Sequence, residues 1–153
     1  MSRKIFLMPN IDEPLEIIRA DWPADRWPNF TFDEWACRHT GKCMVNEQFM
    51  DALQWLRDDV AQPLAVTSGY RHITHPAEVD KIIAGRRPGA HTLAKAVDIK
   101  CSGSLAYNVL QAALRHNFSG IGIQQAGEVN KRFIHIDQAT KDDGFPRPTI
   151  WTY

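Results

Sequence analysis

Residues 68–99 read SGYRHITHPAEVDKIIAGRRPGAHTLAKAVDI, and this stretch ends in an apolar, strand-like run. A second such run, residues 64–67, leads directly into it, and the final run, residues 96–99, contains Asp98. A charged residue inside an apolar run is expensive to bury unless another group pairs with it. Asp98 is therefore expected to have a partner. His91 lies in a Gly-Ala-His-Thr loop from which a loop-to-strand reversal can bring it to the same point.

A second unusual run lies downstream, where residues 132–137 read RFIHID. Polar and apolar residues alternate there, and successive side chains of a strand point to opposite faces. His135 and Asp137 are therefore predicted to share one face of a strand. His91, Asp98 and His135 together offer two imidazoles and one carboxylate. Such a set leaves a tetrahedral zinc ion one open position for water, as catalytic zinc sites do.

These motifs occur in a specific order: SGYR, a histidine and an aspartate separated by six residues, GIG at 120–122, and FIHID at 133–137. The combination resembles the zinc D-alanyl-D-alanine carboxypeptidases, peptidoglycan peptidases that share their fold with the signalling domain of hedgehog proteins. The resemblance covers roughly residues 30–137. It implies that His91, Asp98 and His135 bind zinc. It also implies that Arg71 is the cation facing the scissile carbonyl or a substrate carboxylate.

The general base is the point at which the chain departs from this family. Many relatives carry a glutamate three residues before the last histidine ligand, where this chain has Arg132, and others carry a histidine two residues before it, where this chain has Phe133. Asp137 is predicted to face the same way as His135. It is our candidate base or, alternatively, a residue that orients a metal ligand.

Three further residues are considered for the site. Glu128 and His75 are alternative bases that would reach in from loops. Tyr70 follows the first strand and is predicted either to line the substrate cleft or to pack in the core. Together with Arg71, Tyr70 makes up the expected substrate-binding set.

The order of predicted elements indicates the α+β class, with a small antiparallel sheet flanked by helices, and the family fold agrees. Asn46 is a good N-cap for a helix over residues 47–60, and Thr31-x-x-Glu34 has capping-box spacing. Residues 1–30, rich in Pro and Trp, are expected to form an arm packed on a single domain of residues 31–153. A strand at 5–8 and a helical turn near 15–20 are predicted within it. The tail, residues 138–153, shows little periodicity and is expected to pack along the surface.

The bulk composition is that of a neutral globular domain. Lys plus Arg and Asp plus Glu both count 18 among the 153 residues, so no basic tract indicates nucleic-acid binding. No apolar stretch has membrane-spanning length, and the apolar run near the start is too short for a secretory signal. A cell-wall peptidase without a signal is expected to be made in the cytoplasm. It would reach the wall as phage lysis proteins or virion components do.

Cys37-x-His39-x3-Cys43 leaves three states open: a second zinc site, a disulfide, or free thiols, of which we favour free thiols.

The sequence as a whole predicts a zinc peptidase that hydrolyses peptidoglycan stem peptides or cross-bridges. The alternative is a non-catalytic module that keeps the fold and the metal and binds the cell wall.

Overall fold

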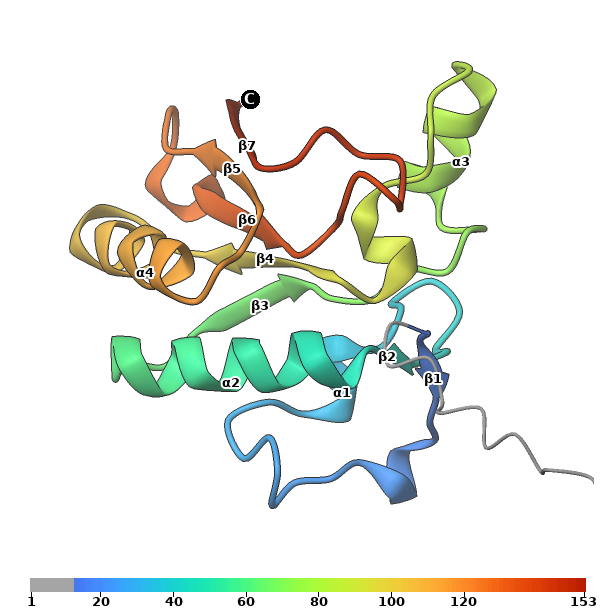
Figure 1. Ribbon diagram of the computed structural model, residues 1–153, viewed down its shortest axis with the longest axis horizontal. Helices are drawn as coiled ribbons and strands as arrows, with labels where there is room; N and C mark the ends of the chain where they lie inside the picture. The colour runs from blue at the N-terminus through green and yellow to red at the C-terminus, as the bar shows by residue number, and fades with distance from the viewer. Residues whose placement is uncertain (1–12) are drawn as a thin grey trace, which may run out of the picture.

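The computed structural model describes residues 13–153 (Figure 1). The predicted strand at residues 5–8 lies outside this range. The elements in chain order are β1 (Leu15–Glu16), η1 (Arg19–Asp21), α1 (Phe32–Trp35), β2 (Met44–Val45), α2 (Glu47–Val60), β3 (Ala65–Ser68), α3 (Pro76–Ile83), η2 (Ala90–Leu93), β4 (Ala96–Lys100), α4 (Gly103–Arg115), β5 (Gly120–Gln124), η3 (Val129–Lys131), β6 (Phe133–Asp137) and β7 (Thr149–Thr152).

A five-stranded sheet forms the centre of the fold, in the order β3-β4-β6-β5-β7. The first four strands pair antiparallel, whereas β7 pairs parallel to β5. A separate two-stranded sheet joins β1 to β2. The structure confirms the predicted α+β class, and the parallel fifth strand makes the larger sheet mixed.

The alternation of β4 and β6 separates the core from the opposite face of the sheet. Val97, Ile99, Ile134 and Ile136 belong to the main hydrophobic core, together with side chains of α2 and α4. The intervening residues of both strands, among them Asp98, face the other way. One face of the sheet is thus covered by the two long helices. The other is left for α3, η2 and the C-terminal segment (Figure 1).

The predicted helix caps are present. The Asn46 side chain accepts a hydrogen bond from the Phe49 N–H at 2.9 Å and begins α2. Thr31 and Glu34 form the expected capping box at the start of α1. Because the caps satisfy N–H groups that have no partner within the helix, they fix where each helix begins.

The ends of the chain differ in detail from the expectations. The helical turn predicted near residues 15–20 is present as the 3₁₀ helix η1, and the two-residue strand β1 precedes it. The tail does not simply follow the surface, because residues 149–152 add β7 to the sheet. In the described part of the N-terminal region, Trp27 and Phe30 are buried in the main core. Within residues 13–153, no helix is both long and apolar enough to cross a membrane.

Phe49 offers a test of this core, because its ring is fully buried between Trp35 and Phe118 at centroid distances of 5.6 and 5.7 Å. Phe49→Ala is expected to lower the free energy of unfolding by about 3–5 kcal/mol, because it leaves a cavity between two aromatic rings. Trp55→Ala, on the exposed side of the same helix, is the control and should change it by about 0.5 kcal/mol or less. Equal losses in denaturant titrations would contradict this packing.

Candidate metal centre

One row of residues crosses the sheet on the face opposite the helices. The strand registers place Ser68 opposite Asp98, Asp98 opposite His135, and His135 opposite Gly122, which pairs in turn with Trp151. Residues paired in this way across neighbouring strands point to the same face. The register alone therefore places Asp98 and His135 side by side.

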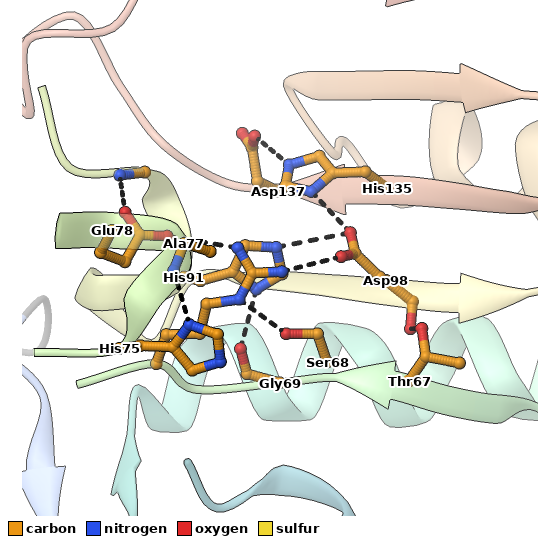
Figure 2. Close-up of polar contacts among 12 residues, drawn as sticks. Thr67, Ser68, Gly69, His75, Ala77, Glu78, His91, Asp98, His135 and Asp137 are labelled. Atoms are coloured by element: carbon orange, nitrogen blue, oxygen red, sulfur yellow. Dashed lines mark hydrogen bonds and ion pairs between the residues drawn. The ribbon is translucent and has the colours of Figure 1, made fainter. Parts of the chain in front are cut away.

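His91 completes the group from outside the sheet. It lies on η2, and its Nε2 is 3.4 Å from Asp98 Oδ1, while His135 Nδ1 is 2.9 Å from the same oxygen. One ligand atom from each side chain lies within 4.8 Å of the other two. Among residues 13–153 this is the one set of three or more His, Cys, Asp or Glu side chains that could hold a metal ion. Figure 2 shows the three side chains pointing toward one another.

The hydrogen bonds of the two imidazoles fit metal binding. His91 Nδ1 lies 2.8 Å from the Gly69 carbonyl oxygen, and His135 Nε2 lies 2.8 Å from Asp137 Oδ2 (Figure 2). Both partners can only accept, so each of these nitrogens carries the proton. His91 Nε2 and His135 Nδ1 are thereby directed at the shared point as lone-pair donors. A carbonyl or carboxylate behind each histidine is the usual arrangement around zinc.

The electrostatics keep the carboxylates charged. Burial alone would raise the pKa of Asp98, but the charges and hydrogen bonds of His91 and His135 outweigh it and hold that pKa well below its usual range. Burial lowers the pKa of His91, which favours the neutral imidazole that metals bind. For His135 burial acts in the same direction, but hydrogen bonds to Asp137 and Asp98 raise its pKa.

Arg71 lies beside the three ligands. Its Nε donates to Ser68 Oγ at 2.9 Å, Nη1 to Glu78 Oε1 at 3.2 Å, and Nη2 to Asp98 Oδ2 at 3.3 Å. All three branches of the guanidinium are engaged, so its orientation next to Asp98 is fixed. The resemblance to the carboxypeptidases anticipated a cation at this point.

Glu78, which the sequence did not single out, positions that arginine. Its side chain is fully buried on α3, and it accepts hydrogen bonds from the Gly89 N–H at 2.7 Å and from Lys81 Nζ at 3.2 Å. Burial would raise the pKa of Glu78, but the Gly89 hydrogen bond and the charge of Lys81 lower it instead. One buried carboxylate therefore holds Arg71 and Lys81 together beside the metal centre.

The three ligands open into a cavity of about 390 Å³. Its lining includes the cations Arg71 and Lys81 and four aromatic side chains. The aromatic residues are Phe133, Phe145, Trp151 and Tyr153. Cationic groups and aromatic rings in one cavity suit a peptide that carries a carboxylate.

The family model described as Peptidase M15 matches residues 28–137, which contain all three ligands and Arg71. The chain belongs to the Peptidase M15 family. A search of curated proteins finds no match. Family membership makes the chain a metallopeptidase by descent, and the His–Asp–His set is the site in the described chain that fits that class.

The candidate bases of this M15 chain are placed differently from one another. Asp137 lines the cavity but is fully buried, and its oxygens accept from His135, Arg147 and the Ala139 N–H. Burial would raise the pKa of Asp137, but His135 and Arg147 lower it to about 2. Glu128 is exposed and pairs with Lys131 at 3.7 Å, away from the cavity.

His75 and Tyr70 also lie outside the cavity lining. His75 caps α3 by accepting from the Ala77 N–H, and its ring faces His39 at 6.0 Å. Tyr70 is buried in the main hydrophobic core, and its N–H donates to the Trp35 carbonyl. The structure thus brings Arg71, Asp137 and the three ligands together in the cavity lining, whereas Tyr70 and His75 lie outside it.

The cysteines do not form a second centre in the described chain. Cys37, Cys43 and Cys101 are all free and buried, which agrees with the favoured free-thiol interpretation. Burial raises the pKa of the Cys43 thiol to about 12 and that of Cys101 to about 11, so both are protonated thiols at neutral pH.

The C-terminal segment contributes Arg147, Trp151 and Tyr153 to the cavity lining, which the sequence patterns did not predict. The available signal was the two-residue spacing of Trp151 and Tyr153, which is typical of one strand face. A four-residue strand offers too few repeats for that spacing to stand out. No pattern marked Glu78, because its helix carries several other charges.

Metal analysis tests the centre directly. Protein purified without chelator and offered zinc is expected to hold about one ion per chain. His91→Ala and His135→Ala should each abolish this binding, because the two ligands that remain hold the ion only weakly. His116→Ala is the control, since His116 pairs with Asp59 away from the cavity. Zinc retained in both ligand variants would contradict this site and point to Cys37, His39 and Cys43.

Proposed function

We propose that this chain is a zinc-dependent peptidase that hydrolyses stem peptides or cross-bridges of peptidoglycan, as a D,D-carboxypeptidase or endopeptidase. The observation that carries the proposal is the convergence of His91, Asp98 and His135 on one point, beside Arg71, inside a cavity of peptide-binding character. Membership of the Peptidase M15 family supports the reaction class.

The ligand set fits zinc in number and kind, with two imidazole nitrogens and one carboxylate oxygen. When bound, zinc would polarise the peptide carbonyl and lower the pKa of a water molecule towards about 7. His91 and His135 would hold the ion as neutral imidazoles, while Asp98 supplies negative charge. Asp137 would fix the ring of His135 rather than act as the base, because its oxygens are already engaged by His135, Arg147 and the Ala139 N–H.

Arg71 would stabilise the oxygen on which negative charge develops when the peptide carbonyl is attacked. Its guanidinium is already oriented by Ser68 and Glu78, so little reorganisation accompanies the reaction. Lys81, which is partly exposed at the cavity, would attract a carboxylate of the substrate. Peptidoglycan stem peptides carry such carboxylates, and the aromatic side chains of the cavity would contact their apolar side chains.

A digest of purified muropeptides tests this function. The zinc-loaded chain is expected to release either a terminal D-alanine or two peptide fragments, which mass spectrometry distinguishes. Arg71→Met should lower kcat about 10²–10³-fold because it removes charge stabilisation in the transition state. Arg115→Met is the control and should leave kcat unchanged, because it removes an arginine of α4 that pairs with Asp59 of α2.

A second candidate function, a non-catalytic module that keeps the metal and binds the cell wall, is favoured by the carboxylates of the cavity. Among the described residues that line the cavity, the two carboxylates are Asp98, a ligand, and Asp137, which is already paired. Neither is free to accept a proton from water, as a base must. A wall-binding module that keeps the metal would show tight zinc and saturable binding to cell walls without release of any fragment. Turnover of any muropeptide would exclude it.

A further inference from the structure

The segment after β6 lies outside the residues matched by the family model, yet it returns to the metal centre. The chain leaves β6 at Asp137 and comes back as β7, parallel to β5, as the red end of the ribbon shows (Figure 1). In the chain, β6 lies between the parallel strands β5 and β7, and residues 138–148 connect β6 to β7. This connection carries Arg147 to the cavity before β7 begins.

The two glycines of β5 make room for this segment. Gly122 lies opposite His135 on one side and Trp151 on the other. A Cβ at position 122 would lie 2.6 Å from Trp151 Nε1. Because that space is free, the indole crosses it and lies against the His135 ring, with the two centroids 5.3 Å apart.

Gly120 leaves a similar space at the start of the same strand. It lies opposite Asp137, and a Cβ there would collide with the Asp137 carboxylate and lie 2.5 Å from Arg147 Nε. In the space that the glycine leaves, Arg147 forms a two-pronged pair with Asp137. Nε lies 2.9 Å from Oδ1, and Nη2 lies 2.8 Å from Oδ2. The Asp137 side chain is fully buried, and that of Arg147 is nearly so.

These contacts form a chain of hydrogen bonds that ends at a metal ligand. Arg147 fixes both oxygens of Asp137, and Asp137 Oδ2 accepts from His135 Nε2 at 2.8 Å. The indole of Trp151 lies against the imidazole and limits its rotation. The ring orientation that directs Nδ1 at Asp98 and His91 therefore depends on residues 147 and 151.

We propose that Arg147 is a positioning residue of the metal centre, acting on His135 through Asp137. A buried carboxylate with only His135 and one backbone N–H as partners is poorly compensated, so without Arg147 it would shift to find another donor. His135 would lose its fixed orientation. The proposal rests on the metal-binding aspect of the proposed function and not on the identity of the substrate.

The test is the zinc dissociation constant of the full chain, measured at constant pH by competition with a chelating dye. Arg147→Met is expected to weaken zinc binding about tenfold, in the range found when partners behind a ligand are removed. Arg147→Lys, which can engage only one oxygen at a time, should fall between Arg147→Met and the wild type. Arg132→Met is the control, because the guanidinium of Arg132 donates to the Gly127 carbonyl and does not contact Asp137 or His135 in the described chain.

A double-variant cycle separates positioning from a structural role. If Arg147 acts through Asp137, Arg147→Met should add little to the loss already caused by Asp137→Asn. Wild-type zinc affinity in folded Arg147→Met, or an undiminished further loss in the Asp137→Asn background, would overturn the proposal. If Arg147→Met fails to fold by circular dichroism, Arg147→Lys decides, and wild-type affinity there would also overturn it.

Because zinc affinity is measured without substrate, the result is independent of whether the chain cleaves peptidoglycan. Weakened zinc binding in Arg147→Met, together with no hydrolysis by the zinc-loaded wild type, would support the positioning role and reject the peptidase proposal. Unchanged zinc binding in Arg147→Met, together with hydrolysis by the wild type, would do the reverse.

Discussion

The structure depends on the two-residue alternation of the paired strands β4 and β6. Their apolar residues enter the core against α2 and α4, and the residues between them are left on the opposite face. The antiparallel register then sets Asp98 directly opposite His135. A shift of one residue in either strand would bury a ligand in the core and expose an isoleucine or valine. The packing that stabilises the sheet therefore also brings the metal ligands together.

Charge is the second constraint on this face. Asp98, Asp137 and Glu78 are all largely or fully buried, and each is held by cationic or N–H partners from a different region of the chain. Buried charges without partners would be strongly destabilising, so the three carboxylates tie α3, η2 and the C-terminal segment to the sheet. The polar face is thus organised by ion pairs in the way that the other face is organised by apolar packing.

Much of this arrangement was predictable from the sequence because local patterns determine it. The caps at Thr31 and Asn46 and the alternation in residues 133–137 each act over a few residues, and the structure confirms them. It also brings His91 close to Asp98. The rest depends on contacts between distant segments. The burial of Glu78 beneath Arg71 and the return of the tail over Gly120 and Gly122 leave no periodic trace in the sequence. The role of Asp137 as base or orienting residue and the role of Tyr70 in substrate binding stay predictions.

The central claim is that the strand register and the hydrogen bonds behind the histidines direct one atom of each ligand at a single metal ion. A crystal structure of the zinc-loaded chain, with anomalous scattering recorded at the zinc edge, tests it most directly. We expect one strong peak within bonding distance of His91 Nε2, an Asp98 carboxylate oxygen and His135 Nδ1, with Asp137 still bonded to His135 Nε2. A peak bonded to His135 Nε2, or one located at Cys37 and Cys43, would contradict it.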